Sequence, residues 1–347
     1  MSLLIIQIPC LNEELTLPVT IGDLPRSIPG VDRIEYLIID DGSTDRTVEV
    51  ARELGVHHLV QFPANRGLAA AFRAGVDACL RLGADFIVNT DGDNQYKGED
   101  IVRLVEPVVA GRADVAIGDR KTSQIAHFSW IKKRLQTLGS WTVRQFSGTD
   151  VVDATSGFRC WSRESALRLN LVNQYTYTLE SIIQSGHNRL TIESVPIGTN
   201  EKLRDSRLFK SIRQYVQRSA LVILRSYLLY KPFATFMALG AVAFSAGSAI
   251  FLRFLWFYAQ GMGGGKVQSL VLAGALLVIG TQLAMMAMLA DLVSANRTLA
   301  EESLLRLRRL EASMAQRSND LPTTSLNDRA LPAPEGQPAS QGEPAGD

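Results

Sequence analysis

Two long uncharged segments constrain the architecture of this chain most strongly. Residues 232–252 and 267–290 contain no Asp, Glu, Lys or Arg, and a short Gly-rich loop at 260–266 precedes the second. Each is long enough to cross a hydrocarbon core of about 30 Å as a helix that rises about 1.5 Å per residue. Two buried core helices are the soluble alternative. The short connection favours a transmembrane hairpin, with spans at about 233–254 and 267–290.

Basic residues gather on the outer flanks of this hairpin. They are Lys210, Arg213, Arg218, Arg225 and Lys231 before it, and Arg297, Arg306, Arg308 and Arg309 after it. The connecting side offers little more than Arg253 and Lys266. Because cytoplasmic flanks of membrane helices carry an excess of Lys and Arg, we expect a multi-pass protein of the cytoplasmic (inner) membrane. Its N-terminal half and both termini would lie in the cytoplasm.

Three further segments adjoin the hairpin. Residues 208–231 mix basic side chains with Leu, Ile, Tyr and Phe, which predicts amphipathic helices in the membrane interface; a helix that closes the preceding domain is the alternative. Residues 291–317 predict a charged cytoplasmic helix, clearest at 299–314. Residues 318–347 are rich in Pro, Gly, Ser and Gln and predict a disordered tail.

Residues 1–207 alternate short apolar runs with segments of helical periodicity. The predicted strands are residues 3–8, 34–39, 58–62, 86–89 and 115–118, and the predicted helices are residues 14–23, 45–54, 68–82 and 99–109. Strands that alternate with helices imply right-handed crossovers and a mostly parallel sheet. The strands are nearly continuous in Val, Ile and Leu, which fits helices on both faces of the sheet. The predicted fold class is α/β.

Composition excludes several kinds of protein. The net charge is +1, so no overall field attracts nucleic acid. The three cysteines, Cys10, Cys79 and Cys160, are scattered and odd in number, which argues against structural zinc and a disulfide framework. Residues 1–8 are apolar but lack the basic region and cleavage site of a signal peptide. They predict a buried first strand.

Two carboxylates, Asp91 and Asp93, follow the predicted strand at 86–89 directly, with Gly92 between them. In open α/β sheets, ligands bind at the carboxyl ends of the strands. Mg²⁺ is usually held by one or two carboxylates together with substrate phosphates. The motif therefore predicts a Mg²⁺ or Mn²⁺ ion that bridges to the diphosphate of a nucleotide-activated donor. A solvated turn is the alternative.

Four other motifs accompany this pair. They are IPCLNEE at 8–14, IIDDGSTD at 38–45, NRG at 65–67 and DATSGFR at 153–159. The first three follow predicted strands or open a helix, so we expect them on the same edge of the sheet as Asp91. Each motif alone could serve as a turn or a helix cap. Their combination indicates one site.

This set of motifs resembles the family 2 glycosyltransferases of GT-A fold, in particular the polyprenyl-phosphate sugar transferases. That group includes dolichol-phosphate mannose synthases, undecaprenyl-phosphate glucosyltransferases and aminoarabinose transferase relatives. The resemblance covers residues 3–208 by motif, and it extends through the hairpin because two-span bacterial members share this layout. It implies a Rossmann-like catalytic domain followed by interfacial helices and the hairpin.

The resemblance also implies roles for particular residues. The nucleotide base and ribose would be surrounded by Pro9, Leu11, Glu13, Ile39 and Asp41. Asp91 and Asp93 would hold the metal against the donor diphosphate, with Gly92 and Gln95 beside them. Phosphate contacts would come from Arg120, whose guanidinium has a fixed fork of donors, and later from Arg204 and Arg207. The acceptor phosphate would meet Lys132, Lys133 and Arg134.

Three positions depart from the family pattern. Leu11 stands where an aromatic residue is usual, and Asp119 stands where Ser is common before Arg120. Glu201 replaces an arginine, which leaves Lys202 or Arg204 as substitutes. These departures bear on the preference for UDP or GDP more than on the reaction class.

The implied reaction is a metal-dependent, inverting hexosyl transfer to a polyprenyl (undecaprenyl or dolichyl) phosphate. A phosphate monoester has a second pKa near 6, so this acceptor needs no general base. Transfer to a glycan or protein hydroxyl would need one, and a non-catalytic membrane partner that retains the fold is a further alternative. Residues 214–219 (QYVQRS) do not match the Gln-x-x-Arg-Trp of processive polysaccharide synthases. Gly240 and Gly247 leave a homo-oligomer open.

Overall fold

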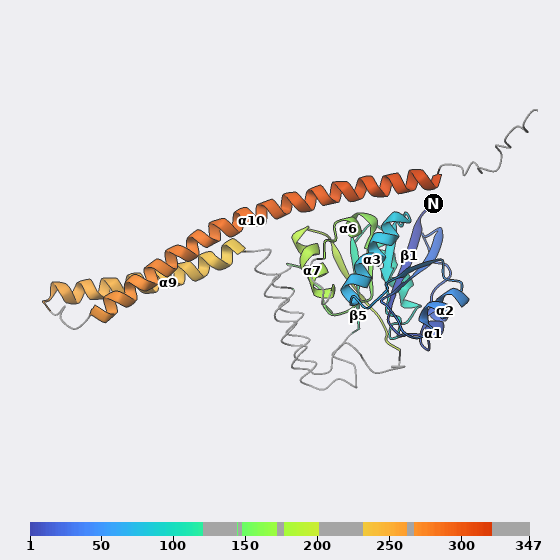
Figure 1. Ribbon diagram of the computed structural model, residues 1–347, viewed down its shortest axis with the longest axis horizontal. Helices are drawn as coiled ribbons and strands as arrows, with labels where there is room; N and C mark the ends of the chain where they lie inside the picture. The colour runs from blue at the N-terminus through green and yellow to red at the C-terminus, as the bar shows by residue number, and fades with distance from the viewer. Residues whose placement is uncertain (121–143, 145–147, 172–176, 201–231, 262–266, 321–347) are drawn as a thin grey trace, which may run out of the picture.

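The N-terminal half of the chain folds around a seven-stranded sheet, and the C-terminal half forms two long helices that project from it (Figure 1). The computed structural model describes residues 1–120, 144, 148–171, 177–200, 232–261 and 267–320. The predicted interfacial segment 208–231 and the predicted tail beyond 320 therefore lie outside the described residues.

The described strands and helices follow one another in the order of an α/β protein. The strands are β1 (Leu3–Cys10), β2 (Arg33–Asp40), β3 (His58–Gln61), β4 (Phe86–Asn89), β5 (Val115–Asp119), β6 (Arg159–Ser162) and β7 (Ile192–Pro196). The helices are α1 (Leu17–Asp23), α2 (Thr47–Glu53), α3 (Leu68–Arg81), α4 (Asp100–Val109), α6 (Arg163–Leu167), α7 (Thr178–His187), α9 (Pro232–Ala259) and α10 (Val267–Asp320). The sequence did not predict β6, β7, α6 or α7.

The strand order in the sheet is β3-β2-β1-β4-β6-β5-β7. All neighbouring strands pair in parallel except β6, which is antiparallel to both β4 and β5. The predicted mostly parallel sheet is confirmed. Because β6 runs the opposite way, its first residue lies at the edge where the parallel strands end. That edge therefore collects the ends of β1, β2 and β4 and the loop before β6.

Strand β1 lies inside the sheet, between β2 and β4, and is buried at every position. Helices α3, α6 and α7 cover one face, where Phe72 packs edge-on against Trp161, with ring centroids 5.2 Å apart. Helices α1 and α4 cover the other face, where Leu17 and Leu104 join the core. Helices on both faces exclude water from the sheet, so the carboxyl edge of the strands is where polar loops can gather.

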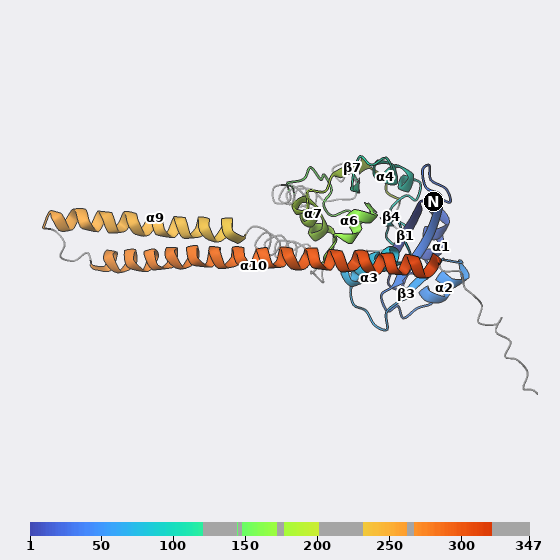
Figure 2. The ribbon, with the colours of Figure 1, turned by 90° about the horizontal axis from the view of Figure 1, so that it is seen from above.

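Helices α9 and α10 lie side by side in both views (Figures 1 and 2). A Cβ atom at Gly280 would lie 2.8 Å from the backbone N of Phe244, and one at Gly240 would lie 3.0 Å from the carbonyl O of Gly280. The close approach of the helices therefore depends on glycine, as in many membrane helix pairs.

Both helices are long and apolar enough to cross a membrane. Only 11% and 17% of their most apolar windows are buried inside the structure, which does not fit core helices of a soluble protein. The chain is therefore membrane-associated. The predicted helix at 291–317 is part of α10, which runs without interruption to Asp320.

Candidate active site

The turn that carries Asp91 and Asp93 follows β4 and packs on the end of β1. A Cβ atom at Gly92 would lie only 3.0 Å from the Sγ of Cys10, and the hydroxyl of Thr20 donates to the Gly92 carbonyl at 3.1 Å. Asn94, which closes the turn, has a φ of 53°, a left-handed conformation that Asn tolerates better than most residues. The small size of Gly92 and the left-handed backbone of Asn94 let the turn fold back over the strand edge.

The two carboxylates have different surroundings. Asp93 is 9% exposed and accepts hydrogen bonds from the side-chain Nε2 and the backbone N of Gln95, at 2.5 and 3.4 Å. Asp91 is half-buried and faces Gly157, where a Cβ atom would lie 3.4 and 3.6 Å from its two carboxylate oxygens. The structure thus places Gln95 as the group that orients Asp93.

This donor set fits a hard divalent cation. Within the described residues, no three His, Cys, Asp or Glu side chains form a cluster that could enclose a metal. Structural zinc needs four such ligands, whereas Mg²⁺ keeps waters and substrate phosphates beside one or two carboxylates. Asp91 and Asp93 at an open strand edge match the second pattern.

A buried polar network supports the floor of the site. The Asn89 side chain donates to the Gly157 carbonyl and to the Tyr177 hydroxyl, each at 2.9 Å, and accepts from Gln7 at 3.0 Å. The Gly157 N–H donates to the Tyr96 hydroxyl at 3.1 Å. Burial, followed by the Asp91 charge, raises the pKa of Tyr177 well above its usual value. The network therefore stays neutral under Asp91.

Replacing Gly157 with Ala should damage the site. The added methyl group would lie 2.8 Å from the Tyr177 hydroxyl and press on Asp91. We expect a loss of about 1–3 kcal/mol of unfolding free energy and a fall in sugar transfer of about tenfold or more. Urea unfolding and turnover with a labelled donor measure both. Gly22→Ala is the matched control, because a Cβ atom there meets nothing within 4 Å; equal behaviour of the two variants would contradict the assignment.

Arg120 is held at the site by a two-pronged ion pair. Its Nε and Nη2 donate to the two oxygens of Asp153 at 2.7 and 3.0 Å, and Nη2 also donates to Thr155 at 2.8 Å. Burial raises the pKa of Asp153, but the charge and hydrogen bonds of Arg120 outweigh it and hold that pKa below its usual value. Burial lowers the pKa of Arg120, but Tyr96, Asp153 and then Asp91 outweigh it and raise that pKa, so the guanidinium stays protonated in this pair.

The loops after β1 and β2 form a braced wall next to the turn that carries Asp91 and Asp93. The Asn12 N–H donates to the Ser43 hydroxyl and the Thr44 N–H donates to the Asn12 side chain, both at 2.8 Å. The Glu13 N–H donates to Thr47 at 2.8 Å. Asn12, like Asn94, has a positive φ, of 54°. The wall is therefore preorganised by side chains that the sequence motifs contain.

The residues predicted around the nucleotide do not all present side chains to this edge. Leu11 is partly exposed at the rim, and Glu13 is 4% exposed. Pro9 is buried, and Ile39 is fully buried in the core beneath α3. The Asp41 carboxylate accepts from the backbone N–H groups of Arg66 and Gly67 at 2.7 and 2.9 Å, so it anchors the loop that opens α3.

The predicted phosphate contacts fall into two groups. Arg120 lies at the site, whereas Lys132, Lys133, Arg134, Arg204 and Arg207 lie outside the described residues. Sequence reasoning did not single out Asn89, Tyr96, Asp153 or Tyr177. Asp153 lies in the DATSGFR motif that the sequence showed, while Tyr177 reaches the site only through the tertiary fold.

Comparison with known proteins gives consistent matches. The profile of Glycosyl transferase family 2 matches residues 5–174. A polyprenol monophosphomannose synthase of Mycolicibacterium smegmatis is 30% identical over 206 residues, which cover 56% of this chain and 76% of the relative. An undecaprenyl-phosphate mannosyltransferase of Micrococcus luteus is 28% identical over 55% of this chain and 80% of its own length.

A UDP-N-acetylglucosamine–dolichyl-phosphate N-acetylglucosaminyltransferase of Methanococcus voltae is 27% identical over 57% of this chain and 86% of the relative. Among solved structures, glucosyl-3-phosphoglycerate synthase of Mycobacterium tuberculosis superposes with a TM-score of 0.51 at 21% identity, over 65% of this chain and 79% of that one. This likeness confirms the predicted GT-A fold.

Proposed function

Since this chain belongs to glycosyl transferase family 2, we propose that it transfers a hexosyl group from a nucleoside-diphosphate sugar to a polyprenyl phosphate. Three relatives carry names of polyprenyl- or dolichyl-phosphate sugar transferases. The observation that carries the proposal is the pair Asp91 and Asp93 at the strand edge, on a chain that also has two helices long and apolar enough to cross a membrane. A lipid acceptor explains why both features occur together.

The donor would lie across the ends of β1, β2 and β4. Asp91 and Asp93 would hold Mg²⁺ or Mn²⁺ with the donor diphosphate, and Gln95 keeps Asp93 in place. When bound, such an ion neutralises charge on a departing diphosphate. Arg120, fixed by Asp153, adds a guanidinium that suits phosphate oxygens. The wall built on Asn12 and Ser43 would border the nucleoside.

The acceptor is better explained as a phosphate than as a hydroxyl. Among the described residues, His57 and His58 lie at the start of β3, on the edge opposite the site, where the His58 ring contacts Glu35 at 2.8 Å. Asp153 is a poor base because its pKa is lowered in the ion pair with Arg120. A dianionic phosphate attacks without giving up a proton, so positioning and charge neutralisation suffice.

The contacts of α10 support the proposed orientation. Its basic extension, which contains Arg308 and Arg309, packs on the catalytic domain after leaving the second span. The domain and this basic segment therefore share one side of the membrane. By the positive-inside rule that side is the cytoplasm.

Removal of divalent ions tests this function directly. Full-length protein in liposomes with undecaprenyl phosphate would be given labelled UDP- and GDP-sugars in turn. We expect EDTA to lower lipid-linked product by about 10²-fold or more, and added Mg²⁺ or Mn²⁺ to restore it. Omitting the lipid phosphate should abolish product as well. Transfer that persists in EDTA would exclude the metal assignment, and transfer to a hydroxyl acceptor alone would exclude the lipid phosphate.

A further inference from the structure

The part of α10 that follows the membrane span lies along the catalytic domain. α10 has 54 residues, or about 80 Å at 1.5 Å per residue, far more than a bilayer needs. Figures 1 and 2 both show its far half running past α3 and α6. The contacts come from Leu305, Arg308 and Arg309, and the segment that carries them, residues 297–309, is here called the brace.

Arg308 is the main anchor of the brace. Its side chain is only 17% exposed, and Nη1 donates to the carbonyls of Leu167 and Leu169 at the end of α6. Nη2 lies 3.7 Å from the Asp77 carboxylate on α3. Burial raises the pKa of Asp77, and Arg308 opposes that rise. One guanidinium thus satisfies carbonyls at a helix end and a partly buried charge.

Two neighbours of Arg308 extend the contact. Leu305 packs against the core cluster that contains Phe72 and Leu80 of α3, and Arg309 pairs with Glu164 of α6. On the opposite face of the same helix, Arg306 is 74% exposed and pairs only with Glu302 of its own helix among the described residues. The brace therefore contacts the domain with one defined face.

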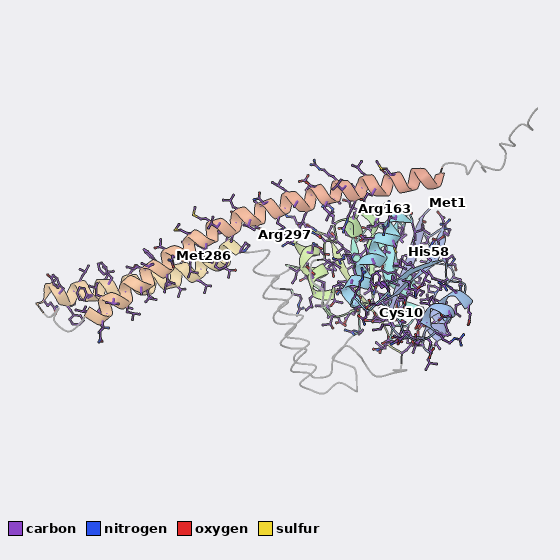
Figure 3. The ribbon with its side chains drawn as sticks, viewed as in Figure 1. Met1, Cys10, His58, Arg163, Met286 and Arg297 are labelled. Carbon is purple, nitrogen blue, oxygen red and sulfur yellow. The ribbon has the colours of Figure 1, made fainter. Side chains whose placement is uncertain are left out.

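The helices that the brace contacts also support the site. The loop before α3 is held by Asp41, and α6 follows β6, whose Arg159 donates to the carbonyls of Ala154 and Ser156 in the DATSGFR loop. In Figure 3, Cys10 at the end of β1 lies on the side of the domain away from α10, whereas Arg163 lies on the side facing it. The brace thus leaves the site edge open.

We propose that the brace orients the catalytic domain toward acceptors embedded in the bilayer, with Arg308 as its positioning residue. The proposal rests on the proposed function. The chain follows the domain into α9, which begins at Pro232, and returns through α10, so the brace gives the domain a second attachment. A second attachment restricts rotation about the first. Because an acceptor phosphate at a membrane surface is confined to a plane, restricted rotation raises its productive encounter with the site.

The test compares one enzyme on two acceptors. Full-length protein would be assayed with long-chain polyprenyl phosphate in liposomes and with a short water-soluble prenyl phosphate in dilute detergent. For Arg308→Ala we expect kcat/KM to fall about tenfold with the liposomes and to change less than about twofold with the soluble acceptor. Leu305→Ala should likewise lower kcat/KM with the liposomes and leave it nearly unchanged with the soluble acceptor. Arg306→Ala should behave as the parent enzyme with both acceptors.

Hydrogen exchange of residues 297–309 gives a readout that does not require transfer. Arg308→Ala should speed exchange in the brace, because undocked helices open more readily. Equal losses with both acceptors, no loss with the liposomes, or unchanged exchange would each overturn the proposal. If the parent enzyme transfers to neither acceptor, the proposed function fails instead, and exchange still reports whether Arg308 docks the helix.

Discussion

Asp91→Asn is expected to lower sugar transfer by about 10³-fold while leaving the fold intact, and Asp93→Asn should act similarly. Asn keeps the size of the side chain but removes the charge that a hard cation requires, and loss of one such electrostatic contact costs about 10²–10³-fold in turnover. Initial rates with a labelled donor measure the effect. Because both residues lie in a turn at an open edge, the unfolding midpoint should stay nearly unchanged.

A carboxylate far from the site is the control for these variants. Asp32 lies at the opposite edge of the sheet, where it is 60% exposed and accepts a hydrogen bond from Ser2. Asp32→Asn should transfer sugar at the parent rate. Near-normal turnover in Asp91→Asn or Asp93→Asn would show that the carboxylates do not hold a catalytic metal.

Asp153→Ala is expected to destabilise the domain by about 3–5 kcal/mol, because it leaves the partly buried Arg120 guanidinium without its ion-pair partner. Transfer should fall as well, since Arg120 would no longer be held beside Asp91. Urea unfolding and turnover measure the two effects. In a double-mutant cycle with Arg120→Ala, the two losses should be strongly non-additive. Additive losses would mean that the two side chains act independently.

The same ion pair predicts a pH dependence. The pKa of Asp153 is lower in the folded protein than its usual value of about 4. Its contribution to stability is therefore complete above about pH 4 and is lost as pH falls through the lowered folded pKa. Asp153→Asn should lack this component, so the difference in unfolding free energy between parent and variant should shrink on acidification. A constant difference down to pH 2 would contradict the assignment.

The sequence predicts the parallel strands of the sheet because each has a local pattern that is easy to recognise. β1, β2 and β4 are apolar runs that end in polar motifs, and their observed ends differ from the predicted ones by two residues or fewer. β6 was not predicted because its Arg159 and Ser162 break the apolar pattern. Arg159 is buried because Ser156, Ala154 and Ser181 satisfy its guanidinium. No local pattern reveals partners of that kind.

Part of the candidate site can likewise be predicted from local sequence, and part of it depends on the tertiary fold. The Asp91 and Asp93 motif follows a strand and needs no tertiary information. Tyr177 meets Asn89 across 88 residues of sequence, and only the packing of α7 brings them together. The roles of Ile39 and Asp41 beside the nucleotide stay predictions. What the sequence does not reveal is that Ile39 packs in the core and that the Asp41 carboxylate accepts from the N–H groups of Arg66 and Gly67.

In the proposed transmembrane hairpin, the unbroken course of α10 would make the position of the catalytic half of the protein depend on bilayer thickness. A helix meets hydrophobic mismatch by tilting, and α10 has no break between residues 267 and 320 that could absorb the tilt as a bend. Tilt of the proposed span within the lipid would therefore displace the far end of α10, and the domain packed on it, sideways. Lipids with longer or shorter acyl chains would shift the height and angle of the enzyme above its substrate plane.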